Sequence, residues 1–159
     1  MIRTSHRRAL FVLSALAALI TLGIAGYSLV DQSVYQPSTP ESLMPGAVSQ
    51  DMVSFLAAAG LFLCIIFIRR GREVDWLIWV GLLGYLFYAY ALYCFEGVYN
   101  HLYLFYIAIL GLVIYSIIIF FMRADLGAIH PKPGKKPPRK AAAVLLLLLV
   151  VMFVALWLT

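Results

Sequence analysis

Five long apolar segments dominate this sequence, and Asp75, near the start of the third, is their one charged residue. They cover about residues 9–30, 52–68, 74–95, 102–122 and 141–158. Each is roughly 17–22 residues long, the length that a helix rising 1.5 Å per residue needs to cross a bilayer. Lipid offers the backbone no hydrogen-bonding partner, which favours helices, and no segment alternates in polarity like a barrel strand. We therefore predict an all-α integral membrane protein, residues 1–159 forming a single membrane domain of about five transmembrane helices.

The composition agrees with this class. Hydrophobic residues make up 64% of the chain and charged residues only 12%, about half the charged share of a soluble domain. The net charge of +5 does not indicate nucleic-acid binding, because the basic residues flank the apolar segments. The first segment is longer than the apolar part of a signal peptide, so we expect it to be retained as a helix.

The basic residues predict an orientation. If the N-terminus lies in the cytoplasm, all twelve Lys and Arg residues fall on the cytoplasmic side, within residues 3–8, 69–72 and 123–140. This is the bias that cytoplasmic loops show. The sequence therefore predicts a multi-pass protein of the cell's inner (plasma) membrane with a cytoplasmic N-terminus. Four acidic residues then face the outer side: Asp31, Glu41, Asp51 and Glu96.

The connections differ in length and chemistry. The outer loop, residues 31–50, contains Pro37, Pro40 and Pro45 and is predicted to be rich in turns, with Ser49 capping the second helix. Two short connections should make helices two to four a compact antiparallel core. The cytoplasmic linker, residues 123–140, is basic and rich in proline, which is typical of an extended tether.

The linker carries a possible lipid contact as well as a topology signal. Basic side chains close to the cytoplasmic leaflet attract anionic lipid head groups. The residues concerned are Lys132, Lys135, Lys136, Arg139 and Lys140. The alternative is a solvated tether that only sets the orientation.

Polar side chains are expected to gather at the outer membrane boundary. The short turn after the third helix places its neighbours together, and the second helix should start at the same depth. The candidate ligand-binding residues are Gln50, Asp51, Tyr88, Glu96, Asn100, His101 and Tyr103. Tyrosine rings and carboxylates suit a small polar or cationic ligand. The alternative is ordinary interface decoration, because tyrosine is enriched at membrane surfaces and an aspartate favours a helix N-terminus.

Other kinds of site lack their signals. No histidine or lysine lies within an apolar segment, which excludes a haem between buried histidines and a Schiff base of the retinal type. P-loop, HExxH and GxSxG motifs are absent from the sequence. Asp51, Glu96 and His101 lack a local metal-ligand spacing. We therefore assign no catalytic residue, metal site or cofactor, and we expect Cys64 and Cys94 to be unpaired.

One resemblance covers about residues 48–112. It is carried by Gln50-Asp51, Arg69-Arg70-Gly71, Gly84-Tyr85 with Tyr88 and Tyr90, and Tyr99-Asn100 with Leu104 and Tyr106. These short motifs resemble those of a group of small, uncharacterised bacterial multi-pass membrane proteins. The resemblance implies a recurring membrane core and no particular activity.

Together these features predict a non-enzymatic membrane protein. It would bind a small polar or cationic ligand at an outward-facing pocket of tyrosines and carboxylates, or act as an accessory subunit of a membrane complex. A small transporter or channel subunit is one alternative. A membrane enzyme acting on lipid head groups or envelope precursors, through Asp51 and Glu96, is another.

Overall fold

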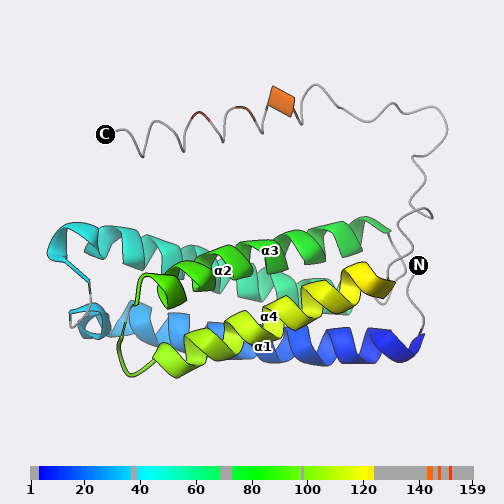
Figure 1. Cartoon of the computed structure of the whole chain (residues 1–159), viewed down its shortest axis with the longest axis horizontal. Coiled ribbons are helices and arrows are strands. Elements are labelled where there is room, and N and C mark those ends of the chain that lie inside the picture. Colours follow the sequence, from blue (N-terminus) through cyan, green and yellow to red (C-terminus); the bar gives the residue numbers. More distant parts are fainter. Residues whose placement is uncertain are drawn as a thin grey trace. The chain divides into compact units, whose positions relative to one another are not determined.

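The computed structural model describes residues 4–36, 39–68, 73–97 and 99–123, with residues 143, 144, 147 and 151. Every regular element in this part of the chain is helical, which confirms the all-α prediction (Figure 1). The elements in order are α1 (Thr4–Val30), η1 (Gln32–Tyr35), η2 (Glu41–Leu43), α2 (Met44–Ile68), α3 (Glu73–Phe95) and α4 (Tyr103–Arg123), where η marks a 3₁₀ helix. The four α-helices are long and apolar enough to cross a membrane.

The chain divides into two compact units, Met1–Leu126 and Gly127–Thr159. The second unit lies almost wholly outside the described residues. The predicted fifth span at 141–158 lies almost wholly outside the described residues and remains a prediction. The same holds for the linker's tether conformation and its lipid contacts.

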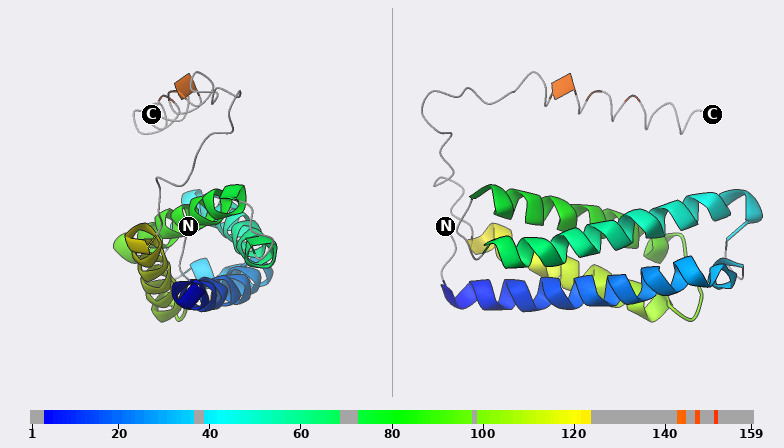
Figure 2. Two further views of the ribbon diagram at one scale, coloured as in Figure 1. Left: turned by 90° about the vertical axis from the view of Figure 1, so that its right-hand side faces the viewer. Right: turned by 180° about the vertical axis from the view of Figure 1, so that it is seen from behind.

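The first unit is an antiparallel four-helix bundle. Helix α1 packs against α2 and α4, and α3 packs against the same two helices from the opposite side (Figure 2). The prediction that helices two to four form the compact core by themselves is therefore too narrow. Small side chains explain the close fit of α1: Ala17, Thr21 and Ala25 are fully buried, and small residues let neighbouring helix backbones approach.

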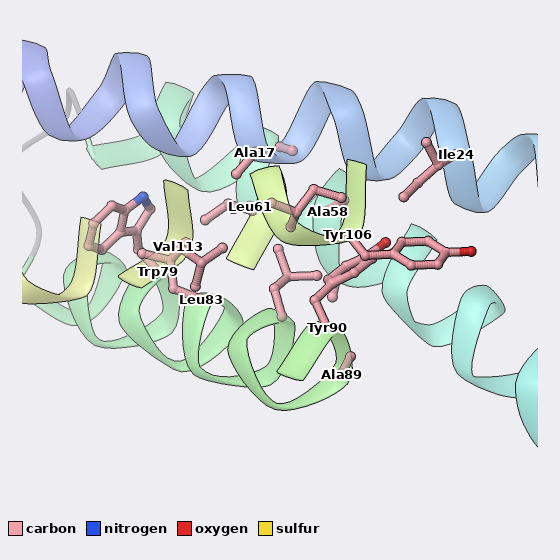
Figure 3. Close-up of a cluster of buried hydrophobic side chains, with 14 of the residues drawn as sticks. Ala17, Ile24, Ala58, Leu61, Trp79, Leu83, Ala89, Tyr90, Tyr106 and Val113 are labelled. Carbon is pink, nitrogen blue, oxygen red and sulfur yellow. The ribbon is translucent and has the colours of Figure 1, made fainter. Parts of the chain in front are cut away.

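The two ends of the bundle differ in their buried aromatic residues. At one end α1 and α3 begin, and Trp76 and Trp79 fill the space between the helices. We call this the tryptophan end. At the other, the tyrosine end, α1 and α3 finish, and Tyr90 and Tyr106 are buried. Leu61 and the other apolar side chains between them close the core (Figure 3).

Helix α2 begins earlier than predicted. We expected a turn-rich loop as far as residue 50, but the helix starts at Met44 and includes Pro45 and Gly46. Proline is tolerated in the first turn of a helix, where its missing N–H has no partner to lose. Ser49 consequently lies inside the helix, where its hydroxyl donates to the Gly46 carbonyl at 2.9 Å, and it is not the predicted cap.

The turn after α3 depends on one glycine. Gly97 has a φ of +67°, and a Cβ added there would lie 3.0 Å from the Tyr99 ring. Replacing Gly97 with alanine is expected to lower the free energy of unfolding by about 1 kcal/mol, because L-residues with a side chain disfavour this conformation. Thermal unfolding in detergent measures this. Gly111→Ala is the matched control, because an added Cβ there meets nothing within 4 Å; equal melting temperatures for the two variants would contradict the prediction.

Candidate functional site

Asp51 is the most deeply buried acidic residue among those described. It lies in α2, seven residues after the helix begins, and is only 3% exposed. The Tyr35 hydroxyl donates to its Oδ2 at 2.5 Å, and the Tyr93 hydroxyl donates to its Oδ1 at 3.0 Å. The buried Ser28 hydroxyl of α1 lies beside the same carboxylate. Asp51 therefore joins α1, η1, α2 and α3 at the tyrosine end.

The position of Tyr35 follows from its local sequence. Asp31 caps η1 by accepting hydrogen bonds from the Ser33 backbone N–H at 3.1 Å and its hydroxyl at 2.6 Å. These bonds hold the pKa of Asp31 below its usual range. The short helix turns Tyr35 into the bundle, where the side chain is 1% exposed. Burial and the hydrogen bond to Asp51 raise the pKa of Tyr35, which keeps the phenol a donor.

Asn100, in the turn between α3 and α4, makes a second contact with the α1–α2 connection that contains η1. Its Oδ1 accepts from the Leu102 N–H at 2.9 Å, which forms an Asx turn just before α4. Its Nδ2 lies 3.4 Å from the Val34 carbonyl and 3.2 Å from the Tyr106 hydroxyl, and donates to both. The ring of Tyr106 stacks on Tyr93 with centroids 5.0 Å apart. These contacts give Asn100 a positioning role.

A pocket of about 410 Å³ opens beside this network, between η2, α2 and α3. Its polar lining consists of Thr39, Gln50, Tyr93 and Glu96. Its remaining lining consists of Pro40, Leu43, Gly46, Ala47 and Leu92. No Lys or Arg lines it among the residues that the structure describes. The volume is within the range of small-molecule sites, and the lining combines apolar walls with a few polar groups.

Tyr93 connects the pocket to the buried carboxylate. It lines the pocket, and its hydroxyl lies 3.0 Å from Asp51 Oδ1 and 3.4 Å from the Ala47 carbonyl oxygen. Gln50 is held against the pocket wall, because its Nε2 donates to the Ala89 carbonyl at 3.1 Å. Glu96 is exposed at the pocket, at the end of α3. A positively charged group in the pocket would therefore meet a solvated carboxylate and a fixed phenol.

The structure divides the seven candidate residues among different places. Gln50 and Glu96 line one pocket, and Asp51 lies behind Tyr93 rather than in the lining. His101 lies elsewhere: its ring meets the edge of the Tyr27 ring, with centroids 5.9 Å apart. Asn100 lies in the α3–α4 turn with the contacts given above. The last two are Tyr88, which is 44% exposed, and Tyr103, whose hydroxyl donates to the Cys94 carbonyl at 3.3 Å.

Sequence reasoning missed Tyr35 and Tyr93. Tyr35 lies in a segment predicted only as a turn-rich loop, and nothing local indicates that it enters the bundle. Tyr93 belongs to a buried face of α3 with Trp79 and Leu86, which lie seven residues apart along the helix. That spacing was a usable signal, but the apolar residues on the other side of α3 mask it. The prediction of unpaired cysteines is confirmed, because both Cys64 and Cys94 are free.

The fold and spans thus define a class: an all-helical bundle whose four described α-helices can cross a membrane, with a polar pocket at one end. Comparison with protein-family models, with curated proteins and with solved structures finds no match to this chain. The resemblance over residues 48–112 stays a prediction.

Proposed function

We propose that this chain is an inner-membrane protein that binds a small organic cation in the pocket at its tyrosine end. In this proposal five helices cross the membrane, the N-terminus is cytoplasmic, and the tyrosine end faces outward. The distribution of the twelve basic residues supports the orientation. The protein acts by binding, not by catalysis.

The pocket lining is the observation that carries the proposal. Glu96 supplies a negative charge, Tyr93 supplies a phenol, and no basic side chain among the described residues competes for the carboxylate. Carboxylates and aromatic rings together favour ammonium groups over anions. The apolar walls, which include Leu43 and Leu92, favour a cation with an alkyl body over a hydrated metal ion.

The core between the pocket and the tryptophan end favours binding over transport. Buried apolar side chains such as Leu61, Leu83 and Val113 lie between the two ends of the bundle. At the tryptophan end Trp76, Trp79 and Phe120 contact one another, with ring centroids 5.6–5.9 Å apart. A cation that enters the pocket therefore meets a largely apolar core, whose buried hydroxyls, such as those of Thr21 and Ser116, carry no charge.

Replacing Glu96 with glutamine is expected to weaken cation binding about fivefold to tenfold, because the variant keeps the shape of the side chain and loses its charge. Equilibrium dialysis of the purified full chain with radiolabelled choline measures the affinity. Glu41→Gln is the matched control, since Glu41 lies in η2 next to the pocket but does not line it. Absence of choline binding to the unaltered protein, or equal losses in both variants, would contradict the proposal.

A further inference from the structure

We propose that the pocket is coupled to the α1–α2 connection through Tyr93 and Asp51, so that a cation in the pocket tightens the attachment of η1 to the bundle. The occupant's charge is taken from the proposed function. The connection itself is carried by the hydrogen bonds and is testable without any ligand.

The attachment of η1 depends on few contacts. Of its residues, Val34 and Tyr35 are buried, whereas Gln32 and Ser33 are exposed. Its polar anchors include the Tyr35 bond to Asp51, the Ser28 hydroxyl beside Tyr35, and the Asn100 bond to the Val34 carbonyl. A short element held this way opens locally at a far lower free-energy cost than the whole bundle. Its opening therefore responds to the strength of the Tyr35–Asp51 bond.

Asp51 lacks a positive partner within the described residues. Its surroundings there are the hydroxyls of Tyr35, Tyr93 and Ser28 and the apolar core. A buried carboxylate without a counter-charge is costly, and hydrogen bonds offset only part of that cost. A cation in the pocket brings a positive charge to the other side of Tyr93. It thereby favours the ionised carboxylate, which accepts from both phenols.

The Tyr93 hydroxyl has one proton to donate and two acceptors near it. It lies closer to Asp51 Oδ1, at 3.0 Å, than to the Ala47 carbonyl, at 3.4 Å. A cation against the phenol oxygen polarises the O–H group and strengthens its bond to the carboxylate. The same carboxylate then holds Tyr35 more firmly. Because coupling between two equilibria is reciprocal, loosening η1 must weaken cation binding.

Hydrogen–deuterium exchange of the full chain in detergent micelles tests this coupling. The readout is the exchange of backbone amides in residues 32–36, with and without choline. Tyr35→Phe should accelerate exchange there at least tenfold, and choline should slow exchange in the unaltered protein. Tyr93→Phe should also accelerate exchange and should abolish the choline effect. Tyr115→Phe is the control, because that ring is 63% exposed on α4, and it should change neither.

The outcomes separate this proposal from the binding function. If choline binds but Tyr93→Phe leaves both η1 exchange and its response to choline unchanged, the coupling is refuted and the binding function stands. If choline does not bind, the binding function fails; unchanged η1 exchange in Tyr93→Phe would then refute the connection as well. Asp51→Asn, checked for helical content by circular dichroism, provides a second variant should Tyr93→Phe fail to fold, and it must likewise accelerate η1 exchange.

Discussion

Replacing Trp79 with alanine is expected to lower the free energy of unfolding by about 3 kcal/mol. Trp79 is fully buried, and its ring packs between Trp76 and Phe120 with centroids 5.6 Å from each. In a membrane, truncation loses little transfer free energy, because lipid is as apolar as the core. The cost arises instead from lost packing contacts around the cavity and from the lost hydrogen bond of the indole N–H to Ser14 Oγ, at 3.3 Å.

Unfolding in mixed detergent micelles with increasing denaturing detergent, followed by circular dichroism, measures this loss. Trp79→Phe should recover about half of it, since a phenyl ring refills part of the volume but supplies no N–H donor. Leu104→Ala is the control, because Leu104 is 77% exposed on α4. A Trp79→Ala protein as stable as Leu104→Ala would mean that the tryptophan end is not packed as described.

Replacing Asp51 with alanine is expected to destabilise the bundle by about 2–4 kcal/mol. The change leaves two buried phenols, Tyr35 and Tyr93, without their acceptor, and each orphaned buried group costs about 1–3 kcal/mol. Tyr93 recovers part of the loss by donating to the Ala47 carbonyl, at 3.4 Å, and the Ser28 hydroxyl beside Tyr35 offers that phenol a second partner. The total therefore stays below the sum of two full penalties.

The same detergent titration measures this effect, and two controls sharpen it. Asp51→Asn should cost less than Asp51→Ala, because the amide keeps one acceptor oxygen and carries no charge. Asp31→Ala removes a carboxylate that accepts from Ser33 and Tyr27 at the surface, and it should cost less than about 1 kcal/mol. An Asp51→Ala protein more stable than the unaltered chain would show that the free-energy cost of burying the carboxylate exceeds the stabilisation from its hydrogen bonds.

Helix positions were predictable because the length of an apolar run along the sequence is enough to locate a membrane-spanning helix. An apolar run that matches bilayer thickness indicates a helix whatever its neighbours are. All four described α-helices finish within one residue of the predicted limits, although α1 starts at Thr4, before the predicted residue 9. The start of α2 was not predictable in this way. Pro45 and Gly46 are typical of turns, but proline also suits a first helical turn, and only the packing of the connection decides between them.

The inward face of each helix was harder to predict than its limits. Residues on both sides of α3 are apolar or aromatic, so the sequence does not show which of its tyrosines point into the bundle. Tyr88 is exposed, whereas Tyr90 and Tyr93 are buried. The partners of Asp51 come from 16 and 42 residues away. Such contacts are fixed by how helices pack rather than by any local pattern. Gln50 and Glu96 were predicted as neighbours because both were expected at helix ends at the same depth; Gln50 instead lies inside α2, and the two residues line one pocket.

Accessibility of the pocket in intact cells tests both the membrane orientation and the cation site. Thr39 lines the pocket, so Thr39→Cys in a Cys64→Ser, Cys94→Ser background places one thiol there. A membrane-impermeant maleimide added outside should label this thiol, and choline should slow the labelling. Labelling only after the cells are opened would contradict the orientation, and labelling from outside at a rate indifferent to choline would contradict the cation site.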